Sequence, residues 1–83
     1  MSLLPPLSLQ ATSFRQGIYE HYKGMRYQVL EVARHSETLD EYVVYKALDG
    51  ERRVWVRPLP MFLETVNIEG RGVIPRFTFV SDQ

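Results

Sequence analysis

Residues 42–57 have the pattern of a β-hairpin. Tyr42–Leu48 is rich in the β-branched and aromatic residues that favour strands, and Asp49-Gly50 directly after it is typical of a tight turn. The next segment, Arg53–Arg57, alternates strictly between valines and larger residues. We expect the valine face of this strand to pack in the core. The opposite face then carries two guanidinium groups around the indole of Trp55.

Other short strand and turn signals surround this hairpin. Pro58 and Pro60 end its second strand, because proline cannot donate to a ladder. Further expected elements are strands at 18–22, 25–34, 65–68 and 76–80, a turn at Lys23-Gly24, a helical turn at 61–64, and a turn at Gly70 and Gly72. No amphipathic helix is present, so the sequence predicts an all-β fold. The expected architecture is a small SH3-like barrel of five to six short antiparallel strands with one short helical turn, and an OB-like, partly open barrel is the alternative.

One folded domain is expected. Residues 1–15 contain Pro5-Pro6, show no hydrophobic period and carry no charge before Arg15, which predicts a flexible N-terminal arm. The alternative is a strand or short helix that caps the barrel or swaps to a partner. Residues 16–83 then form a single small β-barrel domain. Its core is small, so both a monomer and a homodimer are compatible with it.

Charge and cysteine content exclude several functions. Ten Lys and Arg residues cancel ten Asp and Glu residues, which argues against a general binder of polyanions but leaves room for a local basic face. The chain has no cysteine, which excludes disulfides, thiol catalysis and cysteine-based zinc or iron–sulfur sites. No segment has the pattern of a signal peptide or a membrane span. We therefore expect a cytoplasmic protein with no membrane association.

The densest polar cluster follows an expected strand. Arg34 can form paired hydrogen bonds with a phosphate or carboxylate, and His35 can exchange a proton near neutral pH. Ser36 adds a hydroxyl group, and Glu37 can orient the imidazole. Strand ends and loops are where small barrels place binding groups. The alternative interpretation is a turn in which Ser36 or Thr38 caps backbone amides.

A second candidate site surrounds Trp55. An indole flanked by guanidinium groups can stack on a nucleobase, a methylated cation or a peptide ring, and nearby tyrosines can join it. The alternative is structural, with Trp55 covering the second face of the barrel and Arg57 paired with Glu64. Arg76 can complete an anion pocket with Arg34 and Arg57, a convergence that is a hypothesis about the fold. The candidate ligand-binding residues are Arg34, His35, Ser36, Glu37, Trp55, Arg57, Arg76, Tyr19 and His21.

The sequence carries no established metal or catalytic motif. The spacing of His21 and His35 matches no known ligand set, and no nucleophile elbow surrounds Ser36. Gly70-Arg71-Gly72 lacks the Lys-Ser/Thr of a phosphate-binding loop and predicts a turn. We therefore predict no catalytic residue, no metal and no cofactor, and we favour a protein that is not an enzyme.

Several uncommon residues occur in the order typical of one bacterial family. The matching runs are Gly17-x-Tyr19-x-His21-Tyr22-Lys23-Gly24, Ala33-Arg34-His35-Ser36-Glu37-Thr38, Val43-Val44-Tyr45, Trp55-Val56-Arg57-Pro58, Met61-Phe62-x-Glu64 and Pro75-Arg76-Phe77. Over residues 17–80 the chain resembles DUF1653, a family of unknown function, and it departs from that family mainly in its longer N-terminal arm. The resemblance implies a small, mostly stand-alone bacterial protein and no particular activity.

Three functions follow from these residues. The favoured one is a non-catalytic binding module for a ligand with an anionic and a planar part, such as a nucleotide or a nucleic acid. The second is an SH3-like protein-interaction module that binds a peptide or a second copy of itself, which the tyrosine content and neutral charge favour. The third is a small hydrolase that uses His35 or His21 with Glu37, although so short a chain leaves little room for an enclosed pocket.

Overall fold

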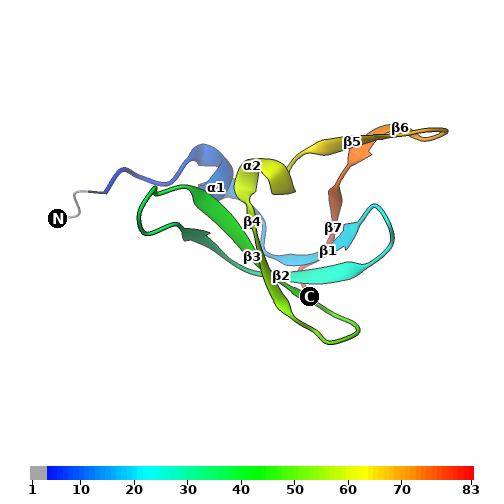
Figure 1. Cartoon of the computed structure of the whole chain (residues 1–83), viewed down its shortest axis with the longest axis horizontal. Coiled ribbons are helices and arrows are strands. Elements are labelled where there is room, and N and C mark those ends of the chain that lie inside the picture. The colour runs from blue at the N-terminus through cyan, green and yellow to red at the C-terminus, as the bar shows by residue number, and fades with distance from the viewer. Residues whose placement is uncertain (1–3) are drawn as a thin grey trace.

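A five-stranded antiparallel sheet forms the centre of the molecule (Figure 1). The computed structural model describes residues 4–83. The elements are α1 (Leu9–Ser13), β1 (Gly17–His21), β2 (Arg26–Arg34), β3 (Glu41–Ala47), β4 (Val54–Pro58), α2 (Leu59–Phe62), β5 (Thr65–Ile68), β6 (Gly72–Pro75) and β7 (Phe77–Ser81). The strand order in the sheet is β4-β3-β2-β1-β7, and β5 pairs with β6 in a separate hairpin. The all-β class predicted from the sequence is confirmed.

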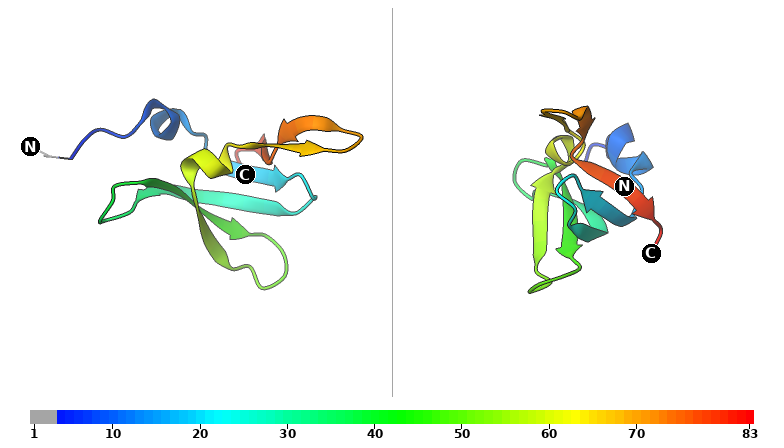
Figure 2. Two further views of the ribbon diagram at one scale, coloured as in Figure 1. Left: turned by 45° about the horizontal axis from the view of Figure 1, so that its top comes forward. Right: turned by 90° about the vertical axis from the view of Figure 1, so that its right-hand side faces the viewer.

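The sheet does not close into a barrel, which corrects the closed SH3-like architecture that we expected. The edge strands β4 and β7 pair only with β3 and β1. Pro58 ends β4 because it has no N–H to donate, and the chain then turns into α2 instead of continuing toward β7. The β5–β6 hairpin follows and projects away from the sheet (Figure 2). Its second strand begins at Gly72, where the sequence predicted only a turn, so the described chain has seven strands.

The core lies between one face of the sheet and the two short helices. Phe62 of α2 and Phe77 of β7 stack with ring centroids 4.0 Å apart and an angle of 2° between the ring planes. Tyr19 and Tyr45 approach the Phe62 ring edge-on at 5.5 and 5.4 Å. Val43 is fully buried at the centre of the same sheet face. Aromatic rings therefore supply most of the buried apolar surface of this small domain.

The two faces of β4 are opposite to the prediction. Trp55 and Arg57 pair with Tyr45 and Val43 of β3, whose side chains are buried in the core. Val54 and Val56 therefore point to the outer face, where they are 54% and 62% exposed. The alternation was predicted correctly, but the choice of buried face was wrong. Because β4 lies at the sheet edge, its core side is partly open, and the long side chain of Arg57 reaches from there toward solvent.

The N-terminal segment lies against the sheet. Ser8 caps α1 through a hydrogen bond that its hydroxyl oxygen accepts from Ala11 N–H at 3.0 Å. Ala11 is buried, and Phe14 stacks on Tyr19 with ring centroids 5.6 Å apart. Residues 1–3 of the predicted flexible arm lie outside the described residues, and the mobility of residues 1–15 stays a prediction.

Candidate functional site

Cationic and aromatic side chains meet at the open rim of the core face. The His21 ring lies 4.5 Å from the Tyr22 ring and 5.0 Å from the Phe77 ring, measured between centroids. The Arg57 guanidinium lies 5.7 Å from the centroid of Phe77. We call His21, Tyr22, Arg57, Arg76 and Phe77 the cation–aromatic surface.

The pKa of His21 shows how the charges of this surface combine. Burial of the imidazole lowers its pKa below the ordinary value. The positive charges of Arg57, Arg76 and Lys23 lower it further. The folded protein therefore keeps His21 neutral at pH 7, and the surrounding field is positive.

Backbone contacts fix Arg76 at this position. Its N–H donates to Glu64 O at 2.9 Å, and its carbonyl oxygen accepts a hydrogen bond from Tyr22 N–H at 3.0 Å. Arg76 thus joins the segment after α2 to the β1–β2 turn. The pairing of β4 with β3 fixes Arg57, which also donates from Nε to the Tyr45 hydroxyl at 3.3 Å.

Neither arginine of this surface is neutralised by an acid. The ion pairs among residues 4–83 are Arg15–Asp82, Arg26–Glu20 and Arg53–Glu51. Arg76 Nε is buried and has no hydrogen-bond partner in the described chain. A buried guanidinium N–H without an acceptor costs about 1–3 kcal/mol or more, because it has lost its hydration. The arrangement therefore favours an acceptor, above all an anionic one, beside Arg76.

The predicted polar cluster at residues 34–37 lies at the other end of β2. His35 Nδ1 accepts hydrogen bonds from Glu37 N–H at 3.0 Å and Thr38 N–H at 3.2 Å, which caps the β2–β3 turn. Thr38 Oγ1 also accepts from Asp40 N–H at 3.2 Å. Residues 34–38 thus follow the capping alternative, with the His35 ring as the main acceptor. Among the described hydrogen bonds, Glu37 meets the imidazole through its backbone N–H rather than its carboxylate.

Of the three arginines expected to converge, Arg57 and Arg76 both act on His21, whereas Arg34 donates to Pro5 O at 2.5 Å and its charge acts on Glu41. Strand position does not explain the difference, because Arg57 lies opposite Val43, which lies opposite Val32 near the Arg34 end of β2. The side chains differ instead: Arg57 reaches to Tyr45 and Phe77, and Arg34 reaches to the N-terminal segment.

Trp55 and Tyr19 differ in their access to a ligand. Trp55 is 52% exposed on the same side of β4 as Arg57, which precedes the end of the strand. Tyr19 is buried in the core, where its hydroxyl donates to Arg15 O at 2.6 Å and burial raises its pKa. Trp55 is therefore accessible to a ligand, near the β3–β4 turn, whereas Tyr19 is not.

Two contributors to this surface were missed in the sequence. Lys23 was interpreted only as a turn residue, yet its charge acts on His21. Tyr45 was expected to be core, and its ring is buried, but its hydroxyl accepts the hydrogen bond from Arg57. The sequence did carry a signal for Lys23. A cation between Tyr22 and Gly24 lies at the tip of the β1–β2 hairpin, where its charge can act on residues at the adjacent end of a neighbouring strand.

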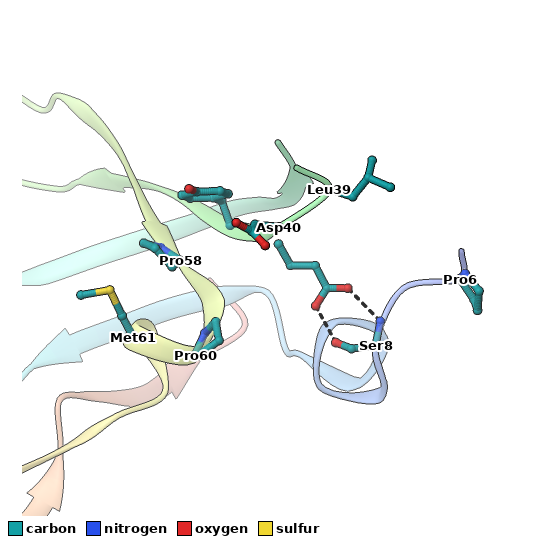
Figure 3. A pocket seen from close by; sticks show the side chains of 9 residues that line it. Pro6, Ser8, Leu39, Asp40, Pro58, Pro60 and Met61 are labelled. Atoms are coloured by element: carbon teal, nitrogen blue, oxygen red, sulfur yellow. Dashed lines mark hydrogen bonds between the residues drawn. The ribbon is translucent and has the colours of Figure 1, made fainter. Parts of the chain in front are cut away.

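A separate cleft of about 590 Å³ lies between the N-terminal segment, the β2–β3 loop and α2 (Figure 3). Its lining residues are Pro6, Ser8, Leu39, Asp40, Glu41, Tyr42, Pro58, Pro60 and Met61. The Glu41 carboxylate accepts two hydrogen bonds there, from Ser8 Oγ at 2.6 Å and Ser8 N–H at 2.8 Å. The cleft could not be predicted from the sequence because the docked N-terminal segment forms one of its walls.

Acidification is expected to release this segment. The two hydrogen bonds from Ser8, and to a smaller extent the charge of Arg34, lower the pKa of Glu41. A lowered folded-state pKa means that the contribution to docking is complete above the unfolded value of roughly 4.5 and is lost as pH falls through the folded value. The amide signals of Ser8–Ala11 should therefore change together with Glu41 protonation in an NMR pH titration. In the Ser8→Ala variant the Glu41 pKa should rise, and equal Glu41 pKa values in the two proteins would contradict this account.

Residues 4–83 contain neither a cluster of metal-binding side chains nor a helix able to span a membrane. This part of the chain contains no group of three or more His, Cys, Asp or Glu residues placed to hold a metal ion. Neither of its helices has the length and hydropathy needed to cross a membrane.

The fold and this surface define a small all-β protein with an open, cationic and aromatic rim. The chain belongs to the family described as "Protein of unknown function (DUF1653)", whose model matches residues 17–79. It is similar to the crystal structure of a DUF1653 protein from Bordetella bronchiseptica, with 39% identity and a TM-score of 0.80, over 88% of this chain and 95% of that one. No curated protein matches the chain. The family model, over residues 17–79, includes every residue of the cation–aromatic surface and does not include α1.

Proposed function

We propose that this protein is a non-catalytic binding module that recognises a ligand with an anionic and a planar part, such as a nucleotide or a short nucleic acid, at the cation–aromatic surface. The observation that carries the proposal is that Arg57 lies over the Phe77 ring, which also contacts His21, while neither Arg57 nor Arg76 has an acidic partner among residues 4–83. A phosphate accepts hydrogen bonds from guanidinium groups and opposes the positive field at the same time. The cysteine-free sequence suits a reducing cytoplasm, where we place this role.

Each side chain has a separate role in this proposal. Arg76 and Arg57 hold the anionic group, and neutral His21 can donate from Nε2–H because its Nδ1 accepts from Lys23 N–H at 3.1 Å. The exposed indole of Trp55 offers a stacking face for the planar part, a contact worth about 1–3 kcal/mol per base. Because the chain has no net charge, affinity depends on these local groups rather than on the overall field.

Two-dimensional NMR titration of labelled protein tests the proposal. The probes are inorganic phosphate, a nucleoside, a nucleoside monophosphate and a short single-stranded oligonucleotide. We expect the NMR signals of the His21 and Arg76 amides and of the Trp55 indole N–H to shift with the nucleoside monophosphate and the oligonucleotide. The shifts should be smaller with inorganic phosphate or the nucleoside alone. For the single-stranded oligonucleotide, two phosphate contacts predict that the logarithm of the association constant falls with the logarithm of the salt concentration with a slope of roughly −1.4.

A matched variant provides the control. Arg71→Gln removes the same charge from the exposed tip of the β5–β6 hairpin and should leave the titration unchanged. Shifts confined to residues 34–38, or no shift with any phosphate-bearing probe, would reject the cation–aromatic surface as the site.

A further inference from the structure

The outer edge of β4 is uncovered. β4 pairs in the sheet only with β3, and it also contacts α2, which follows it in the chain. Figure 2 shows β4 along one border of the molecule. Three consecutive apolar residues, Val54, Trp55 and Val56, are each more than half exposed on this edge. An open edge with adjacent apolar side chains is a template for pairing with another strand.

The hydrogen-bond pattern shows which backbone groups are available. Ala47 N–H donates to Arg53 O at 3.0 Å, so Arg53 directs its backbone groups toward β3. Backbone groups alternate in direction along a strand, and Trp55 and Arg57 therefore also face β3. Val54 and Val56 direct their N–H and C=O groups to the open side. Pro58, the next residue in this series, has no N–H and limits the edge to these two donors.

The overall dimensions indicate surface that a partner can cover. The chain exposes 5999 Å², whereas a compact monomer of 9.7 kDa exposes roughly 5,100 Å². The Cα radius of gyration is 14.0 Å, compared with roughly 11.8 Å for a compact chain of this length. The chain as a whole thus exposes about 900 Å² more than a compact monomer, and a standard interface covers roughly 800 Å² of each partner.

We propose that β4 pairs antiparallel with β4 of a second copy of this chain and joins the two sheets into one. The available groups select one register, in which Val54 faces Val56 of the other copy and Trp55 lies on the two-fold axis. Each Val54–Val56 pair then exchanges two hydrogen bonds, and the four valines cover each other on the outer face. A register with Val54 opposite Val54 of the other copy would allow only one such pair within β4. A register with Val56 opposite Val56 of the other copy would bring Val54 opposite Pro58, which has no N–H to donate.

Charge is compatible with this register. It brings Arg53 opposite Arg57 of the other copy, and two bare guanidinium groups there would repel each other. Arg53 is paired with Glu51 at 2.9 Å, so its charge is already balanced. Arg57 points inward to Tyr45 and Phe77. The zero net charge of the chain adds no long-range repulsion between copies.

Sedimentation and hydrogen exchange test the proposed dimer together. We expect a mass of twice 9.7 kDa at high protein concentration, with the amides of Val54 and Val56 protected at least roughly tenfold more than in the dilute monomer. Val56→Pro removes only an N–H on the open side and should leave the β3–β4 ladder intact. It should raise the dimer dissociation constant roughly tenfold or more, because the symmetric interface loses two hydrogen bonds.

Two further variants separate the β4 edge from other surfaces. Val56→Lys should also weaken the dimer, since it places a charge in the valine contact, whereas Val73→Lys, at an equally exposed position on β6, should not. A monomer at all concentrations would overturn the proposal. So would a dimer that survives Val56→Pro with freely exchanging Val54 and Val56 amides. Either result leaves the proposed ligand site available, because without β4 pairing the Trp55 indole, which the two proposals share, stays exposed.

Discussion

The Phe62→Ala variant is expected to lose about 3–5 kcal/mol of folding free energy. Phe62 is 1% exposed, stacks face to face on Phe77 and receives ring edges from Tyr19 and Tyr45. Its removal leaves a cavity bounded by rings that cannot collapse into it without losing their own contacts. A chain of this length has a total stability of roughly 4–12 kcal/mol, so the variant should lose about a third or more of it and unfold at a much lower urea concentration.

Urea denaturation followed by circular dichroism measures this loss. Leu63→Ala is the matched control, because Leu63 is the next residue and is 42% exposed, compared with 1% for Phe62. The control should lose less than about 1 kcal/mol. A loss of similar size in both variants would show that α2 does not anchor the core as described. If Phe62→Ala cannot be purified, Phe62→Leu should still lose measurable stability, because it keeps the volume partly but removes the stacked ring.

The positions of the strands could be predicted because their signals are local. Alternation and turn residues located the segment Tyr42–Leu48 to within one residue of β3. The buried face of β4 could not be predicted this way. Val54 and Val56 are more apolar than Arg57, so the sequence of β4 alone favours burying the valines. The pairing of Trp55 and Arg57 with the buried residues Tyr45 and Val43 of β3 instead determines which face of β4 turns to the core. That register depends on packing between distant segments rather than on β4 itself.

The same distinction applies to the candidate site. Arg57 and Arg76 were selected because each follows or lies in a strand near an aromatic residue, and both lie on the cation–aromatic surface. Arg34 had an equally good local pattern. The backbone of Arg57 is level with Val32, close to Arg34, but its side chain reaches to Tyr45 and Phe77, whereas the Arg34 side chain reaches to Pro5 of the N-terminal segment. Sequence motifs thus identified groups able to bind an anion, while tertiary contacts determine where each side chain points.

The largest functional effect is expected when both arginines of the cation–aromatic surface are replaced. Charged hydrogen bonds contribute about 1.5–3 kcal/mol each, so Arg57→Gln and Arg76→Gln should each weaken binding of a nucleoside monophosphate roughly 10- to 100-fold. The two guanidinium groups act on one anion, and the double variant should therefore lose less than the sum of the two single free energies. Isothermal titration calorimetry with the Arg71→Gln control measures these affinities.

The pKa of His21 gives a second readout that needs no ligand. Arg57 and Arg76 both lower this pKa in the free protein, so each substitution should raise it, and the double variant should raise it most. A bound phosphate should raise the His21 pKa in the wild-type protein for the same reason, because it opposes the positive field. The lowered pKa also means that stability falls as pH drops below roughly 6.5, since the unfolded chain then takes up a proton before the folded chain does. If the His21 pKa rises in the variants while the affinity stays constant, the two arginines surround His21 as described but do not bind the ligand. If both change together, one anion interacts with both arginines at the open rim of the sheet.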